Sequence, residues 1–209
     1  MSALNDINMG MKNKLLNAQH LSLNEQVKIL SEFVMSIDII PQILDEISTL
    51  PNAWLGGGVI FQNVWNVIHG YEINTYIKDI DILYWDDTDL TWQSENSYIS
   101  ALNETLVNTD IPLDVKNIAR IHLWYEERFG IPKTAYFSVQ ESISTWPVLG
   151  ACMAMRIKGQ QLEFIAPHGF QDMFSLRVRP NKILVTQAIY ESKAIKWQEQ
   201  WPMLLIEAW

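Results

Sequence analysis

Two aspartates separated by a single residue, Asp79 and Asp81, lie within an apolar run from Ile77 to Trp85. Side chains alternate between the two faces of a β-strand, so both carboxylates are expected on one side of a sheet. Mg²⁺ prefers oxygen ligands and is often held by one or two carboxylates together with substrate phosphates. The pair is therefore a candidate metal site, although an Asp-x-Asp pattern alone is more typical of solvated or turn-capping carboxylates.

Three consecutive glycines, Gly56, Gly57 and Gly58, come about one short helix before the aspartates. Glycines let a backbone approach a ligand closely, and outward-facing amides bind phosphate where a helix starts directly behind them. The segment from Phe61 to His69 predicts such a helix, which Gly70 ends. A glycine triplet alone is more often a turn or a packing point. The order of strand, glycine turn, helix and Asp-x-Asp strand favours a site for a nucleoside triphosphate and a metal ion.

A third carboxylate, Asp114, lies between apolar neighbours in a short predicted strand over residues 112–116. A lone aspartate in such a strand is usually a satisfied edge residue, but its burial is inexpensive beside a metal ion. The helix predicted over residues 117–127 places Arg120 four residues from Lys116, on one face. These two cations are interpreted either as phosphate ligands or as a surface ion-pairing face.

The elements that must position these residues alternate between helical and extended patterns. Residues 1–50 are predicted to be helical, with a capping box formed by Ser22 and Glu25. A short strand, Ala53 to Leu55, leads into the glycine turn, and two strands around Lys158-Gly159 predict a hairpin. Further helices are expected over residues 94–108, 138–146, 171–176 and 186–201.

Length and charge limit the domain organisation and the partners. The chain has 209 residues, of which 48% are hydrophobic, enough for a substantial core. We expect a single domain over residues 1–209, in which 1–50 form a helical N-terminal segment and 51–209 form a catalytic core with a helical C-terminal part. The formal net charge of −9 argues against a large nucleic-acid surface. A small molecule or a protein fits this charge better than long RNA or DNA.

Cysteine usage and the N-terminal sequence indicate a compartment. Cys152 is the single cysteine, so the chain forms no internal disulfide and suits a reducing environment. The N-terminus lacks a basic segment followed by an apolar run, and no stretch approaches the ~20 apolar residues of a membrane span. We therefore expect a cytoplasmic protein with no signal peptide and no membrane partner.

These motifs belong to an ordered set that resembles the bacterial nucleotidyltransferase family of the DNA polymerase β-like superfamily. The resemblance covers nearly the whole chain from Ala53 onward, and it implies an α+β polymerase β-like fold with a small mixed sheet flanked by helices and helical N- and C-terminal segments. The stretches that carry it are Leu55-Gly56-Gly57-Gly58, Asn63-Val64-Trp65, His69-Gly70, Asp79-Ile80-Asp81, Asp114-Val115-Lys116-Asn117, Ala119-Arg120, His122, Trp146-Pro147, Ala166-Pro167-His168-Gly169, Asp172, Arg179-Pro180-Asn181 and Trp201-Pro202.

The resemblance implies that Asp79, Asp81 and Asp114 are catalytic and bind two metal ions, Mg²⁺ or Mn²⁺. One metal ion would activate an acceptor hydroxyl, and the other would hold the phosphates of the leaving pyrophosphate. Two positions depart from the family pattern: Gln62 stands where Arg is frequent, and Asn66 stands where Asp is usual. The residues implied in nucleotide binding are Gly56, Gly57, Gly58, Asn63, Lys116 and Arg120.

The sequence therefore predicts an enzyme that transfers a nucleoside monophosphate from a nucleoside triphosphate to a hydroxyl of a small molecule or a protein. Two alternatives remain open. A glycosyltransferase also uses an Asp-x-Asp pattern, but the glycine turn and Asp114 fit it less well. A non-catalytic nucleotide-binding or interaction protein would keep the carboxylates without turnover, and Gln62 mildly favours it. The acceptor, the preferred base, the oligomeric state and the role of residues 1–50 are left open.

Overall fold

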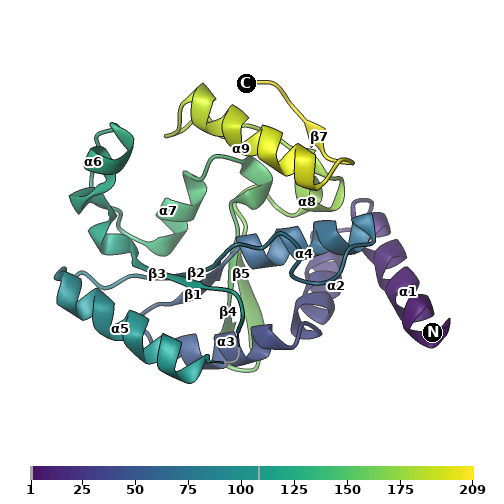
Figure 1. The fold of residues 1–209 in the computed structure, drawn as a ribbon, viewed down its shortest axis with the longest axis horizontal. Helices are drawn as coiled ribbons and strands as arrows, with labels where there is room; N and C mark the ends of the chain where they lie inside the picture. The colour runs from purple at the N-terminus through teal and green to yellow at the C-terminus, as the bar shows by residue number, and fades with distance from the viewer. Residues whose placement is uncertain (1, 108) are drawn as a thin grey trace.

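The structure is a computed structural model that describes residues 2–107 and 109–209. Within these residues, a mixed sheet with the strand order β3-β2-β1-β4-β5 lies at the centre of the molecule (Figure 1). β2 and β3 are parallel, whereas the other neighbouring strands are antiparallel. The strands are β1 (Trp54–Gly56), β2 (Ile80–Tyr84), β3 (Leu113–Asn117), β4 (Ala154–Lys158) and β5 (Gln161–Ile165).

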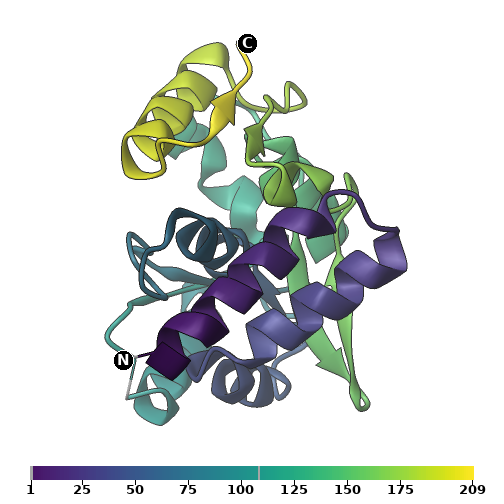
Figure 2. The same cartoon turned by 90° about the vertical axis from the view of Figure 1, so that its right-hand side faces the viewer.

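Helices from the N-terminal part of the chain cover one face of this sheet. α1 packs against α2 and α4, and α3 packs against β1, so this part of the chain belongs to the main core. Figure 2 shows α1 and α2 in front of the strands. The predicted capping box is confirmed, because the backbone N–H of Ser22 donates to Glu25 Oε2 at 3.0 Å. The helices are α1 (Ser2–Ala18), α2 (Leu23–Met35), α3 (Ile39–Ile47), α4 (Gly58–His69) and α5 (Trp92–Thr105), the last of which packs against β3.

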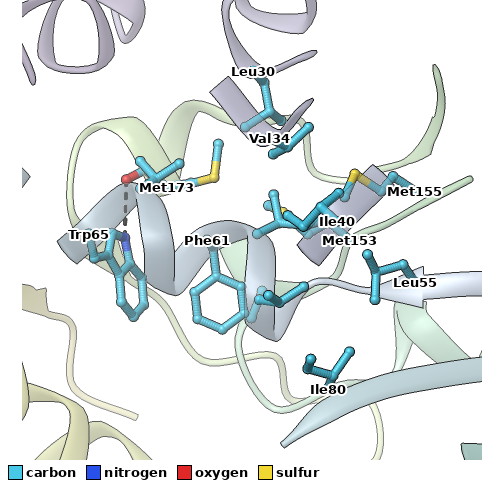
Figure 3. Close-up of a cluster of buried hydrophobic side chains, with 14 of the residues drawn as sticks. Leu30, Val34, Ile40, Leu55, Phe61, Trp65, Ile80, Met153, Met155 and Met173 are labelled. Atoms are coloured by element: carbon cyan, nitrogen blue, oxygen red, sulfur yellow. Dashed lines mark hydrogen bonds between the residues drawn. The ribbon is translucent and has the colours of Figure 1, made fainter. Parts of the chain in front are cut away.

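The main core lies between the sheet and these helices. Leu30 of α2, Leu55 of β1 and Ile80 of β2 are buried in one cluster (Figure 3). Trp65 of α4 packs there and donates from Nε1 to the carbonyl of Met173 at 3.2 Å. This bond connects α4 to α8 (Gln171–Phe174), a segment more than a hundred residues later in the sequence.

The opposite face of the sheet carries a smaller apolar cluster that includes Trp54 and Leu83. The helix predicted over residues 117–127 is divided in two, because the 3₁₀ turns end at Trp124, whose φ of −133° lies outside the helical region. The elements on this side are η1 (Ile118–Leu123), α6 (Tyr125–Phe129) and α7 (Val139–Ser144), whereas η2 (Leu149–Ala151) packs against α8.

The last helix, α9 (Gln187–Gln200), is anchored near both of its ends. The hydroxyl of Tyr190 lies 2.9 Å from the carbonyl oxygen of Val178 and 2.5 Å from that of Glu207. Just beyond the helix, Trp201 donates from Nε1 to Asn66 Oδ1 at 2.8 Å. Two short parallel strands, β6 (Arg177–Val178) and β7 (Leu205–Ile206), complete this region.

Candidate active site

Strand β2 presents its residues alternately to two environments. Ile80 is buried in the main core, whereas Asp81 and Leu83 line a cavity on the other face of the sheet. In the parallel register, Asp81 is paired with Asp114 and Leu83 with Lys116. Paired residues of neighbouring strands point to the same face, so the sheet brings two carboxylates and a lysine together. The alternation predicted from the Asp-x-Asp strand therefore holds for Asp81.

The cavity has a volume of about 840 Å³, within the range of small-molecule sites. The sheet and the start of α4 form one part of its wall, and α9 and the segments around η1, α6 and α7 form the rest. Its charged lining residues are Lys78, Asp79, Asp81, Lys116, Lys193 and Lys196. Its aromatic lining residues are Phe61, Tyr76, Trp124, Tyr125, Phe129, Tyr136, Trp146 and Trp197.

Asp81 has the most perturbed carboxylate of the cavity. Desolvation of this half-buried side chain raises the pKa of Asp81 to about 6, and Lys116 opposes this shift while Asp114 and Asp79 add to it. Hydrogen bonds are not among the main causes of this pKa shift. A desolvated carboxylate is costly unless a cation approaches it. The side chain is thus suited to receive a cationic ligand.

The other two predicted metal ligands are placed differently. Asp79 precedes β2 and is exposed at the cavity, whereas Asp114 forms an ion pair with Lys116 of its own strand. Within residues 2–107 and 109–209, no group of three His, Cys, Asp or Glu side chains is arranged to hold a metal ion. The structure therefore brings Asp79 and Asp81 to the cavity and holds Asp114 against a lysine.

The three glycines have two different roles. A Cβ on Gly56 would lie 2.6 Å from the Cβ of Asp81, and a Cβ on Gly57 would lie 2.5 Å from Met153 Cγ. Both glycines are therefore required by close packing within the fold. Gly58, the first residue of α4, lines the cavity, and a Cβ there would meet Asp81 Oδ2 at an ordinary 3.6 Å. Of the triplet, Gly58 is the residue that a ligand can approach.

Asn63, predicted to bind nucleotide, lies outside the cavity lining and is fully buried. Its Nδ2 donates to the carbonyl of Val59 at 2.9 Å and to Asn74 Oδ1 at 3.0 Å, so it fixes the loop after α4. The neighbouring Asn66 donates to the carbonyl of Thr75 and accepts from Trp201. A carboxylate at position 66 has no N–H to donate, which explains why an amide stands where Asp was expected.

Arg120, also predicted to bind phosphate, faces away from the cavity. It is buried, forms an ion pair with Glu95 of α5, and donates from Nε to the carbonyl of Leu90 at 2.8 Å. Lys116 lies in β3 and Arg120 in the following 3₁₀ turn, so the helical spacing that placed them on one face does not exist. Of these two cations, Lys116 lines the cavity and Arg120 stabilises the packing of α5.

Three lysines of the cavity wall were not identified from the sequence. Lys193 and Lys196 come from α9, and Lys78 lies immediately before the Asp-x-Asp strand. The first two are separated from Asp81 by more than a hundred residues, and the sequence around them carries no motif. Only their three-residue spacing on a helix could have indicated a shared face.

The chain belongs to a nucleotidyltransferase family, whose profile matches residues 45–206. It is also similar to a protein whose NMR structure is described as revealing a CCA-adding enzyme head domain. That similarity covers 87% of this chain and 96% of the other, with a TM-score of 0.70 and 20% identity, and it shows the fold.

These findings confirm the predicted α+β fold and the nucleotidyltransferase family. No curated protein matches the chain. Among the described residues, no helix has the length and apolar character needed to cross a membrane.

Proposed function

We propose that this protein transfers a nucleoside monophosphate from a nucleoside triphosphate to a hydroxyl of a small molecule or a protein. The observation that carries the proposal is the position of Asp81, a desolvated carboxylate in a lysine-rich cavity beside the first residue of α4. A helix start favours phosphate, and the carboxylate favours a cation, so the two together suit a metal-bound triphosphate. Family membership supports the same reaction class.

The residues of this chain mainly position the substrate and offset its charge. Gly58 would place the first amides of α4 against the phosphates, and Lys116 would balance charge on the sheet side. In the reaction, the acceptor oxygen attacks the α-phosphorus, and the bond from that phosphorus to the oxygen bridging to the β-phosphorus breaks. Pyrophosphate leaves, and the hydroxyl proton passes to water.

The carboxylates present fit a divalent metal ion, because Asp81 is desolvated and Asp114 is its partner in the register of the neighbouring strand. Oxygen donors of this kind suit Mg²⁺ or Mn²⁺. We propose that Asp79, Asp81 and Asp114 would hold the metal, with Asp114 exchanging its contact to Lys116. When bound, the metal would polarise the phosphate and the acceptor oxygen.

The remaining features of the proposal follow from charge and packing. A net charge of −9 favours a small or proteinaceous acceptor over a nucleic acid. The single cysteine suits a cytoplasmic location. We also propose that residues 1–209 form one nucleotidyltransferase domain, because α1 packs on α4 and Trp201, beyond α9, binds Asn66 of α4.

The test compares the wild type with Asp81→Asn, which removes one carboxylate at nearly constant volume. Binding of ATP, GTP, CTP and UTP is measured by calorimetry with and without Mg²⁺, and pyrophosphate release is assayed with panels of hydroxyl compounds and proteins. We expect metal-dependent binding of at least one nucleotide by the wild type, and a loss of turnover of at least about a hundredfold in the variant. Asp87→Asn is the matched control, because Asp87 is exposed and lies outside the cavity lining. Absence of nucleotide binding in the wild type would refute the proposal.

One observation favours a second function, nucleotide binding without turnover. Asp114 is engaged by Lys116, and within the described residues the carboxylates form no three-membered metal cluster. A protein of this kind would bind a nucleoside triphosphate in the cavity and release no pyrophosphate with any acceptor. The binding and turnover measurements above separate the two functions.

A further inference from the structure

The cavity carries positive charge in a protein that is acidic as a whole. Four lysines and two aspartates line it, whereas the 209-residue chain has a formal charge of −9. Charges of one sign that gather in a concave, partly desolvated site raise the local concentration of the opposite ion. The excess of lysines therefore points to an anionic ligand.

Three of these lysines are not neutralised by ion pairs. Lys116 pairs with Asp114, but Lys78, Lys193 and Lys196 form no ion pair within 4.0 Å in the chain that the structure describes. These three lysines are exposed to solvent, but they share one cavity wall. Repulsion between their ammonium groups disfavours this convergence, and an anion bound between them would relieve it.

Lys78 and Lys196 lie near each other in the cavity wall. The proximity of Lys78 is the main reason why the pKa of Lys196 is lowered. Both groups are donors only, so they cannot satisfy each other. A phosphate oxygen between them would accept from both.

Lys193 lies one helical turn from Lys196 on α9 and extends the same surface toward the carboxylates proposed to bind the metal. Its ammonium lies in the cavity, where burial lowers its pKa while Asp81 and Asp79 raise it. The lysine surface is thus continuous with the carboxylates, as a chain of phosphates next to a metal ion requires.

We propose that Lys78, Lys193 and Lys196 form a polyphosphate-binding site, and that the triphosphate of the nucleotide lies between these lysines and the start of α4. This assignment of the ligand rests on the proposed function. The amides at Gly58 and the lysines of α9 line the same cavity, so one extended anion contacts both. Lysine ammonium groups bind phosphate as point charges, and flexible stems let them adjust to a chain of several phosphates.

The test measures binding of inorganic tripolyphosphate to the 209-residue protein by calorimetry in EDTA, which removes divalent metal. The variant Lys193→Gln/Lys196→Gln is expected to bind at least about tenfold more weakly than the wild type, and Lys78→Gln is expected to weaken binding less. The control is Lys28→Gln/Lys158→Gln, which removes the same charge from exposed positions outside the cavity lining. Thermal unfolding of every variant shows that the fold is kept.

A selective loss in the cavity variants in EDTA, together with displacement of a bound nucleoside triphosphate by tripolyphosphate when Mg²⁺ is in excess, supports the proposal. No binding by the wild type, equal weakening in the control, or binding without competition overturns it. Asp81→Asn separates this result from the proposed function, because it should lose turnover without weakening tripolyphosphate binding in EDTA. If no acceptor supported turnover but tripolyphosphate bound through the lysines, the anion site would stand and the transferase would not.

Discussion

The two faces of the central sheet carry alternate side chains of the same strands, and these side chains have different roles on each face. On the face covered by α1 to α4, alternate residues such as Leu55, Ile80 and Val115 are buried in a continuous apolar core. On the other face, the intervening residues Asp81 and Lys116 line a cavity. A strand therefore contributes to stability with every second side chain and to the site with the others.

Charged side chains are paired with each other in the packed parts of the molecule, but most of those in the cavity have no ion-pair partner among the described residues. Where α5 packs, Arg120 and Glu95 form a closed buried pair. On the cavity face, Asp81 is desolvated and forms no such ion pair within the described residues. The cavity lysines that also form no ion pair in this part of the chain are Lys78, Lys193 and Lys196. The first arrangement is complete within the protein, whereas we propose that a ligand completes the second.

The largest effect on stability is expected at Arg120. Absence of this effect would contradict the contrast between the packed parts of the molecule and the cavity. Arg120→Met leaves Glu95 buried without its cation and should lower the free energy of unfolding by about 3–5 kcal/mol. Nucleotide affinity of the folded protein should change less than about twofold, because Arg120 lies outside the cavity lining. Urea unfolding and calorimetry measure the two quantities.

Adding Glu95→Gln is the control for Arg120→Met. The double variant leaves no buried charge at this pair. Its glutamine side-chain oxygen can still accept from the backbone N–H of Asn117, as Glu95 Oε1 does, so part of the lost stability should return. A large loss of nucleotide affinity with unchanged stability would instead place Arg120 in the site.

An intermediate effect is expected where the two faces meet, at the glycine turn. Gly57→Ala places a Cβ 2.5 Å from Met153 Cγ and 2.7 Å from the Met153 carbonyl oxygen, so the backbone must shift. We expect a loss of about 1–3 kcal/mol, measured by thermal unfolding. Gly58→Ala is the matched control: its contacts would be ordinary, so stability should hold while nucleotide affinity falls. Equal destabilisation by both substitutions would contradict the assignment of separate roles.

The smallest effect is expected from Asp81, whose raised pKa makes the stability of the folded protein depend on pH. Because the pKa of Asp81 is raised in the folded protein to about 6, from an ordinary value near 3.8, the folded state holds a proton that the unfolded state releases. Stability is therefore lost as the pH rises from about 4 to about 6, and the loss persists above that range.

Asp81→Asn removes this cost, so the metal-free variant should be more stable than the wild type by about 1–2 kcal/mol at pH 7. The difference should shrink toward zero near pH 4. Denaturant unfolding at several pH values measures it, and a variant less stable than the wild type at pH 7 would show that the carboxylate is satisfied.

The fold and part of the site could be predicted from the sequence. Period-two alternation placed Asp81 on one face of a strand, and the apolar runs and capping signals located the main helices, as the capping box of Ser22 and Glu25 illustrates. These features depend on local spacing. The family pattern added the fold class, which the comparisons confirm.

The remainder depends on contacts between distant segments. Lys193 and Lys196 reach the cavity because α9 folds back over the sheet, and no local pattern marks that return. Arg120 was assigned to phosphate because a helix was expected, but a 3₁₀ turn directs it to Glu95. Packing likewise decides the glycines, since the need for Gly57 comes from Met153, almost a hundred residues later.

The hydrogen bond between Trp201 and Asn66 has a consequence for the affinity of a ligand that binds in the cavity. It joins the residue after α9 directly to α4, and Tyr190 holds the other end of α9 through two carbonyls. These bonds hold α9 in position relative to α4, so the helix that carries the lysines is placed beside the amides at the start of α4. A ligand that bridged the two helices would therefore need to order little of the backbone, which favours its affinity.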